Sequence, residues 1–100
     1  MIMRTKEGQD RHDHGVLVVA SEARQRGWTT VFADLPTYAK PPVIQSYVPD
    51  IYAHNGRAEL IVEVETNDSI GTAHAIAQKM AFTRWQQESP TLRKFQVIVA

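Results

Sequence analysis

Hydrophobic and polar positions follow two different periods along this chain, and the changes of period divide it into elements. Apolar residues recur at steps of three and four from Val16 to Ala23, which is the spacing of one face of an α-helix. Gly27 follows, and a glycine at this place can adopt the left-handed conformation that ends a helix. The pattern predicts a helix over residues 12–26 and leaves the polar residues 1–11 as a flexible N-terminal arm.

The next stretch, WTTVFADL at residues 28–35, is rich in β-branched and aromatic residues and stops at Pro36, as is typical of a β-strand. Residues 36–46 contain three prolines and show no hydrophobic period. Proline lacks the backbone N–H that a sheet needs. This segment is therefore expected to form a loop, long enough to border a functional site.

Two further strand patterns lie at residues 47–53 and 58–66, on either side of Asn55-Gly56. Asn-Gly between two β-rich runs is a strong signal for a tight hairpin turn. The two strands are therefore expected to pair in antiparallel orientation.

Helical periodicity returns over residues 69–88, with N-cap side chains at residues 67–69 and Pro90 just beyond its end. The residues expected on its buried face are Ile70, Ala73, Ala77, Met80, Ala81 and Trp85. The apolar run at residues 95–100 predicts a last strand, parallel to the strand before the helix. The chain is therefore expected to be α/β, with the order αβββαβ and a mixed four-stranded sheet flanked by helices.

Composition narrows the range of partners. A chain of 100 residues with 43% hydrophobic content suits one compact domain, expected over residues 12–100. Eleven basic and eleven acidic side chains give a formal charge of zero, so any contact with nucleic acid must be local. The chain has no cysteine, which excludes a disulfide framework. No apolar run approaches the about 20 residues that cross a bilayer, and we find no leader pattern. We therefore expect a soluble, cytoplasmic protein without a membrane partner.

Strand geometry places the acidic residues of the hairpin on one face. With a two-residue turn, Asp50 lies opposite Ile61, and opposed residues share a face because side chains alternate along each strand. Asp50, Glu63 and Glu65 then lie on the same face as Tyr52. The opposite face is apolar throughout and must belong to the core; it consists of Ile51, Ala53, Leu60, Val62 and Val64.

Two interpretations of these acids remain open. They can be the water-facing side of an antiparallel hairpin, or they can form a metal site. The second strand of the hairpin precedes a crossover, where helices cover both faces of a sheet and exposed carboxylates are less expected. Neighbouring carboxylates also repel each other unless a cation compensates. Oxygen ligands from Asp50 and Glu63, with the carbonyl of Val64, suit Mg²⁺ or Mn²⁺.

Pro49-Asp50, followed thirteen residues later by Glu63-Val64-Glu65, resembles the motif of the PD-(D/E)XK nuclease superfamily, which includes restriction endonucleases and Holliday-junction resolvases. The similarity covers nearly the whole chain, because the expected order of elements also matches. The resemblance implies that Asp50 and Glu63 hold Mg²⁺ and that residue 65 completes the catalytic site.

The chain departs from this family at two places. Most members have lysine where this chain has Glu65, which can act as a general base or help to hold a second metal instead. Lys79 is a candidate for a migrated lysine, with a solvated surface position as the alternative. Relatives often carry an acid near the start of the first helix, where Asp13 and His14 are the nearest residues here.

Other polar clusters are expected to have structural or solvent-facing roles. His12-Asp13-His14 has the residue types of a transition-metal site, but beside a loose arm it is expected to be solvated. His74 precedes Gln78 by one turn, and both can face a substrate or the surface. Basic residues that can contact phosphates gather near the N-terminus; they are Arg4, Lys6, Arg11, Arg24 and Arg26.

The sequence thus predicts a metal-dependent phosphodiesterase acting on nucleic acid, with DNA as the favoured substrate, in which Asp50, Glu63 and Glu65 are catalytic. The alternative is a nuclease-like fold without catalysis, serving as a binding or assembly module. A glycosidase with two carboxylates is a third option, disfavoured by the small size of the domain. An uncovered last strand would also favour a twofold homodimer.

Overall fold

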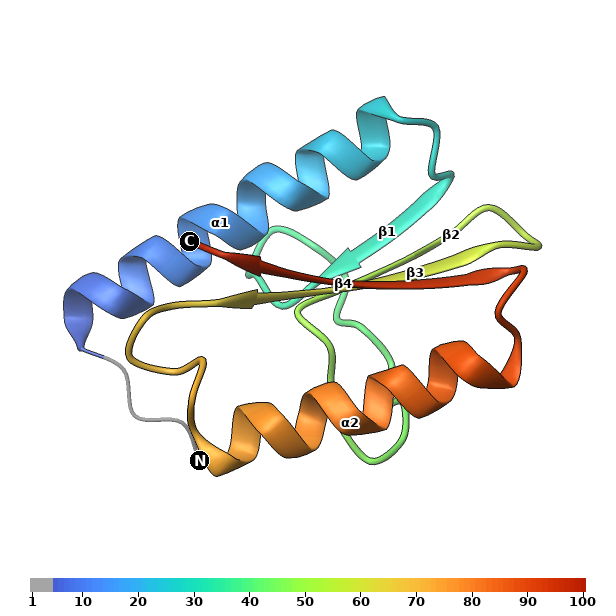
Figure 1. Ribbon diagram of the computed structural model, residues 1–100. Coiled ribbons are helices and arrows are strands. Elements are labelled where there is room, and N and C mark those ends of the chain that lie inside the picture. Colours follow the sequence, from blue (N-terminus) through green and yellow to red (C-terminus); the bar gives the residue numbers. More distant parts are fainter. Residues whose placement is uncertain (1–4) are drawn as a thin grey trace.

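The computed structural model of the protein describes residues 5–100, and Figure 1 shows its six elements. They are α1 (Lys6–Gln25), β1 (Thr30–Ala33), β2 (Ile51–His54), β3 (Glu59–Glu65), α2 (Ala73–Glu88) and β4 (Arg93–Val99). The four strands form one sheet in the order β1-β2-β3-β4. Neighbouring strands are antiparallel except for β3 and β4, which are parallel. The predicted αβββαβ order and mixed sheet are confirmed.

The two helices cover opposite faces of the sheet (Figure 1). The predicted apolar face of the hairpin packs against α1, and all five of its predicted residues are buried there, together with Val16, Ala20 and Ala23 of α1. On the other face, Ile61 packs with Phe82 and Trp85 of α2. The face that carries the acids is therefore covered by a helix and is not the water-facing side of a hairpin.

Helix α1 begins six residues earlier than predicted. Its N-cap is Thr5, whose hydroxyl oxygen accepts a hydrogen bond from the backbone N–H of Gly8 at 3.0 Å, a standard way to satisfy the free N–H groups of a first turn. Residues 6–11 are thus helical, and the prediction of a flexible arm is wrong for them; residues 1–4 lie outside the described part of the chain. The predicted helix end is confirmed, because Gly27 has a φ of 95° directly after the C-cap.

The hairpin loop is wider than the sequence suggested. His54 pairs with Glu59 and Ile51 with Val62, so the loop has residues 55–58 and the prediction of a two-residue turn is wrong. The side-chain oxygen of Asn55 accepts hydrogen bonds from the N–H groups of residues 57 and 58, which stabilises the wider loop. The register moves by two positions, so every side chain keeps its predicted face.

Helix α2 begins later than predicted. Residues 67–71 form turns, and the N-cap is Thr72. Ser69 cannot serve as the cap because it is buried and uses its hydroxyl within the loop. The later start changes the buried face, which consists of Ala75, Gln78, Ala81, Phe82 and Trp85. Of the residues predicted to be buried, Ile70, Ala73 and Met80 are exposed.

Strand boundaries also shift by a few residues. Strand β2 starts only at Ile51, after Pro49, and the segment before it is held by an isolated bridge between Ile44 and Tyr47. Strand β4 starts two residues early, at Arg93. Among residues 5–100, neither helix is both long and apolar enough to cross a membrane.

Candidate functional site

Asp50 and Glu63 lie side by side where β2 begins. The strand register, continued by one residue beyond Ile51 and Val62, places Asp50 beside Glu63. A carboxylate oxygen of Glu63 accepts a hydrogen bond from the backbone N–H of Asp50 at 2.7 Å. Glu63 is only 3% exposed, and the Asp50 side chain is 16% exposed. Two acidic side chains thus share a mostly enclosed corner at the C-terminal end of β3.

The backbone of Val64 faces the same corner. Its N–H donates a hydrogen bond to Asp50 Oδ2 at 2.8 Å. In an extended strand the carbonyl of a residue points toward the same neighbouring strand as its N–H. The Val64 carbonyl therefore lies on the Asp50 side of β3, where the sequence resemblance expects a metal ligand.

His12 reaches this corner from α1. Its Nε2 lies 3.1 Å from Asp50 Oδ1, and its Nδ1 lies 3.1 Å from Asp13 Oδ1. Both ring nitrogens face carboxylate oxygens, an arrangement in which a protonated imidazole can donate to both. His12 is 5% exposed, so the expectation that the His12-Asp13-His14 segment is solvated is wrong for His12. The resemblance named Asp13 and His14 as the residues nearest to the family's acid at the start of the first helix, but His12 is the residue that contacts Asp50.

The sequence carried a signal for the burial of His12, although its position beside the expected arm suggested a solvated segment. The buried residues of α1 include Gly8, His12, Val16 and Ala20, which repeat every four residues on one helix face. The predicted helix over residues 12–26 already contains His12, four residues before Val16, so the same period places His12 on the buried face.

Glu65 is buried with 5% exposure but is held by a different group. Its carboxylate accepts a hydrogen bond from the Ser69 hydroxyl at 2.5 Å, and Ser69 Oγ also accepts from the backbone N–H of Thr66 at 3.0 Å. Thr66 in turn donates its hydroxyl proton to Asp68. Glu65 thus lies on the acidic face as predicted, oriented by the loop that joins β3 to α2.

The donors in this corner have the chemistry of a hard-cation site. Carboxylate oxygens of Asp50 and Glu63 and the carbonyl of Val64 are the ligand types that Mg²⁺ and Mn²⁺ prefer. Within residues 5–100, no three side chains of His, Asp or Glu converge closely enough to form a complete metal cage. Mg²⁺ commonly retains several waters and uses only one or two carboxylates, so the two acids and one carbonyl fit such an ion.

The other predicted site residues divide between the two sides of α2. Gln78 is 8% exposed and its amide donates to the Val48 carbonyl at 3.3 Å. Lys79 is exposed and lines a shallow surface hollow with Met80 and Thr83, so it does not replace a lysine at the acidic corner. His74 is exposed, with its ring edge against Tyr47 at a centroid distance of 5.7 Å.

Strand β3 carries another acid, Glu59, at its opposite end. Glu59 accepts hydrogen bonds from the Tyr52 hydroxyl at 2.7 Å and from Arg93 Nε at 2.9 Å. Burial raises the pKa of Tyr52, and the hydrogen bond to Glu59 raises it further, to about 12. Burial alone would raise the pKa of Glu59, but the hydrogen bonds from Tyr52 and Arg93 and the charge of Arg93 lower it overall.

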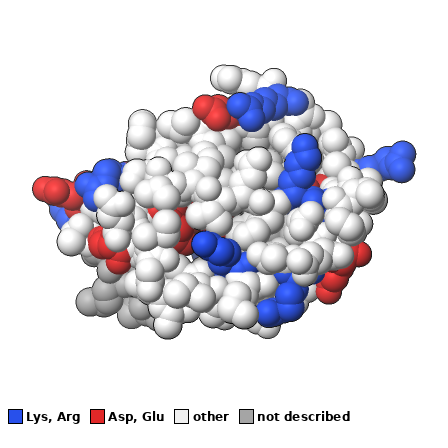
Figure 2. Space-filling view, viewed as in Figure 1, with Lys and Arg blue, Asp and Glu red and all other residues white. Residues whose placement is uncertain are grey.

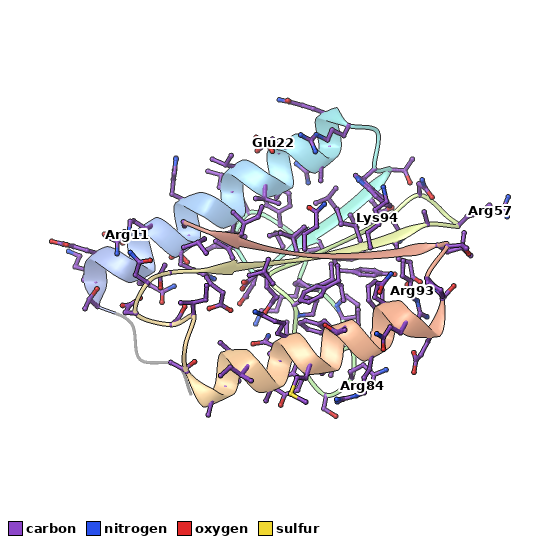
Figure 3. All side chains as sticks on the ribbon, in the orientation of Figure 1. Arg11, Glu22, Arg57, Arg84, Arg93 and Lys94 are labelled. Carbon is purple, nitrogen blue, oxygen red and sulfur yellow. The ribbon has the colours of Figure 1, made fainter. Side chains whose placement is uncertain are left out.

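Within residues 5–100, the basic residues predicted to contact phosphates do not form one cluster. The predicted basic group is spread along α1, with Arg11 near the N-terminal end (Figure 3) and Arg24 packed over the Tyr38 ring at 4.1 Å; Arg4 lies outside the described residues. The face in Figure 2 carries separate basic and acidic groups on a largely uncharged surface. On this face, no continuous basic area of residues 5–100 marks a nucleic-acid footprint.

Comparisons with known proteins gave no match: none of the family models fits the chain, and no similar curated protein or solved structure was found. The residues and their geometry are therefore the basis for any functional conclusion.

Proposed function

We propose that the protein is a metal-dependent phosphodiesterase acting on nucleic acid, with DNA as the favoured substrate. The observation that carries this proposal is the pairing of Asp50 and Glu63 at one corner of the sheet, beside the Val64 backbone. Two neighbouring carboxylates that are largely enclosed repel each other, and this repulsion lowers the stability of the fold unless a cation compensates for it. The PD…EVE motif adds support, since it supplies the same residues.

Each residue of the corner has a role in this proposal. Asp50 and Glu63, with the carbonyl of Val64, would hold Mg²⁺ or Mn²⁺, which supplies a Lewis acid for the phosphoryl oxygen. His12 fixes the orientation of the Asp50 carboxylate through Nε2. Glu65, kept in place by Ser69, takes the proton from the attacking water as general base.

Thermal melting with and without divalent metal tests the proposal directly. A ligand that binds only the folded state stabilises it by RT ln(1 + [L]/Kd), about 1.4 kcal/mol at ten times Kd, which raises the midpoint of a domain of this size by several degrees. We expect this rise with Mg²⁺ or Mn²⁺ in the wild type and not in Asp50→Asn. Glu88→Gln, which neutralises an acid at 58% side-chain exposure far from the corner, is the matched control.

Cleavage completes the test. The wild type is expected to nick supercoiled plasmid DNA when Mg²⁺ or Mn²⁺ is present and to stop when a chelator is added. A midpoint that no concentration of either metal moves, together with intact plasmid, would refute the proposal.

A second candidate is a nuclease-like fold without catalysis, acting as a binding or assembly module. One observation favours it: both carboxylate oxygens of Asp50 already have a partner in the protein, Oδ1 in His12 Nε2 and Oδ2 in the Val64 N–H. Lys79 also does not lie at the acidic corner. A metal-dependent rise in the melting midpoint without any cleavage would favour this candidate.

The proposed partners and location follow from the same features. Strand β4 is an edge strand, and pairing of two such edges about a twofold axis would form a homodimer. Sedimentation velocity over a range of concentrations tests this. The lack of cysteine fits a cytoplasmic location, which fractionation of the source cells would check.

A further inference from the structure

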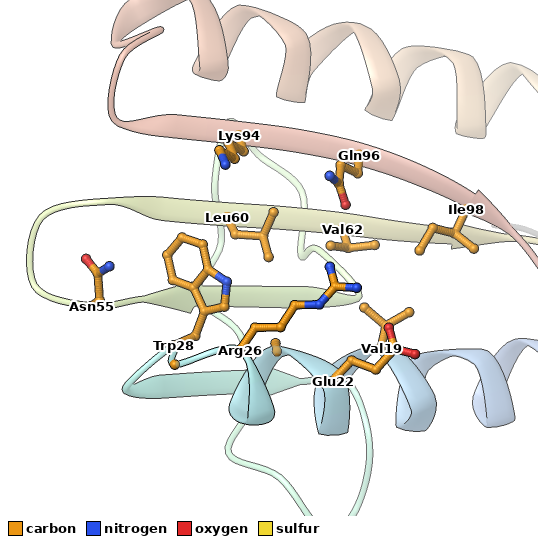
Figure 4. Close-up of a pocket in the computed structure, with 12 residues that line it drawn as sticks. Val19, Glu22, Arg26, Trp28, Asn55, Leu60, Val62, Lys94, Gln96 and Ile98 are labelled. Carbon is orange, nitrogen blue, oxygen red and sulfur yellow. The ribbon is translucent and has the colours of Figure 1, made fainter.

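A second hollow, with none of the acidic-corner residues in its wall, lies between α1 and β4. It has a volume of about 510 Å³, within the range of pockets that take small organic molecules. Helix α1 packs mainly over β1, β2 and β3, so the near face of β4 is left exposed. The floor of this cavity is formed by Leu60 and Val62 of β3, as Figure 4 shows.

Two cationic side chains line the cavity from opposite sides. Arg26 comes from the end of α1 and Lys94 from β4 (Figure 4). Among residues 5–100, neither lies within ion-pair distance of a carboxylate, in contrast with Arg93, which pairs with Glu59 and Glu88. Two cations without a protein counter-ion at one cavity favour an anionic ligand that accepts from both, as a phosphate group does.

The cavity also offers a flat apolar surface. The half-buried indole of Trp28 lies between Asn55 and Leu60 (Figure 4). Aromatic faces of this kind stack on nucleobases with little preference for one base. The side-chain amides of Asn55 and Gln96 supply both donors and acceptors for the edge of a planar ring.

Glu22 is the one carboxylate among the cavity-lining residues in the described part of the chain. A carboxylate repels a phosphate but accepts hydrogen bonds from hydroxyl groups, as acidic residues do at ribose sites. Figure 4 shows Glu22 near Val19, on the helix side of the cavity. The wall thus combines cations, a stacking surface and a hydroxyl acceptor.

We propose that this cavity binds a nucleoside monophosphate, with the base on Trp28, the phosphate between Arg26 and Lys94, and the ribose hydroxyls at Glu22. The same chemistry is present in a free nucleotide and in the phosphorylated end of a single strand. Nucleotide binding at this cavity needs neither Asp50 nor Glu63, so this proposal can be tested independently of the proposed phosphodiesterase activity.

Isothermal titration calorimetry with adenosine 5′-monophosphate tests this site on the full chain. We expect saturable binding to the wild type, at least tenfold weaker binding to Arg26→Gln and to Lys94→Gln, and none to the double variant. Arg57→Gln is the matched control, because Arg57 lies at the tip of the hairpin loop, outside the cavity (Figure 3). Circular dichroism verifies that each variant is folded.

Further ligands separate the parts of the proposal. Adenosine and orthophosphate alone should each bind at least tenfold more weakly than the monophosphate. The 2′-deoxy nucleotide should bind more weakly to the wild type, and Glu22→Gln should remove this difference. A 5′-phosphorylated trinucleotide that binds more tightly than the mononucleotide identifies a strand end as the ligand, and the reverse order identifies the free nucleotide.

Quenching of the Trp28 fluorescence gives a second readout that does not depend on the charge variants. Trp85 is 4% exposed, so a ligand in the cavity should quench Trp28 selectively. No saturable binding of the monophosphate at millimolar concentration, or equal affinity in wild type, Arg26→Gln and Lys94→Gln, would overturn the proposal.

Discussion

The two ends of β3 carry acids in opposite electrostatic surroundings. Glu59 and Glu63 lie four residues apart on the same face of the strand. Glu59 has a guanidinium and a phenol as hydrogen-bond donors, so its charge is balanced within the fold. Glu63 instead lies beside a second acid, Asp50, and accepts from a backbone N–H. At one end an acid is paired with a guanidinium, and at the other two acids lie side by side, where we propose that a cation binds.

The largest effect is expected from exchanging each glutamate for its amide. Under the proposed function, Glu63→Gln should lower the metal-dependent cleavage rate at least about 100-fold, because it would remove a charged ligand of the proposed metal. Glu59→Gln should leave the rate within about threefold of wild type. Plasmid nicking rates at saturating Mg²⁺ compare the two variants. Equal losses of rate in Glu63→Gln and Glu59→Gln would show that the two ends of β3 do not differ in function.

The next effect concerns stability at the Glu59 end. Arg93→Met removes one of the two donors to Glu59 and also the contacts of Arg93 with the Trp85 carbonyl and with Glu88. We expect the free energy of unfolding to fall by about 1–2 kcal/mol, at the low end for a paired charge because the site is partly exposed. Urea denaturation measures the change. A double-mutant cycle with Glu59→Gln should show coupling between these two residues, and additive effects would contradict the ion pair.

A smaller effect is expected from pH at the same end. The pKa of Tyr52 is raised from 10.0 to about 12, so folding favours the protonated phenol. Its contribution is complete below pH 10 and is lost as the pH rises toward 12. The pKa of Glu59 is lowered from 4.5, so its contribution is complete above this value and is lost as the pH falls through the lowered pKa.

The comparison of wild type with Tyr52→Phe isolates the alkaline effect. Melting midpoints of the two proteins should converge as the pH rises from 10 to 12. Parallel curves across this range would show that Tyr52 does not contribute. The comparison of wild type with Glu59→Gln isolates the acid effect, and the melting midpoints of these two proteins should converge as the pH falls below 4.5.

The smallest effect on stability is expected where α1 packs against β3, at the Glu63 end of the strand. A Cβ added to Gly15 would lie 2.9 Å from Val64 Cγ1, whereas one added to Gly71 would meet nothing within 4 Å. Gly15→Ala should therefore lower the free energy of unfolding by about 1 kcal/mol despite its higher helix propensity, and Gly71→Ala should change it by less than about 0.5 kcal/mol. Urea denaturation of both variants measures this, and a stabilised Gly15→Ala would show that the helix can move away from β3.

The periodic parts of the sequence predicted the fold well. Alternation in the hairpin identified the core face from Ile51 to Val64 because it depends on burial. The strand–helix–strand connection gave the parallel pairing of β3 and β4 because it depends on chain connectivity. The turn between β2 and β3 was harder to predict, since the Asn55 side chain competes with a tight turn for the same backbone N–H groups. The start of α2 was missed because Ser69 satisfies Glu65 instead of capping the helix.

The acidic corner was predicted in part. Asp50 and Glu63 were identified from their spacing, and the wider loop brings them closer than the predicted register would. His12 was missed because residues 1–11 were expected to form a flexible arm, so the first predicted helical residues were expected to be solvated; the helix in fact starts at Lys6. The four-residue period of α1 indicates that His12 is buried, but it does not show which strand residue His12 contacts.

The length of the four-residue loop at 55–58 affects two properties: which side chains face the core, and which residue of β3 lies beside Asp50. A slip of one position would exchange the core face for the acidic face and unfold the protein, but a slip of two positions preserves every buried residue. Loss of two loop residues would therefore keep the scaffold intact while moving Asp50 away from Glu63. The length of this short connection therefore sets the distance between Asp50 and Glu63 independently of which side chains face the core.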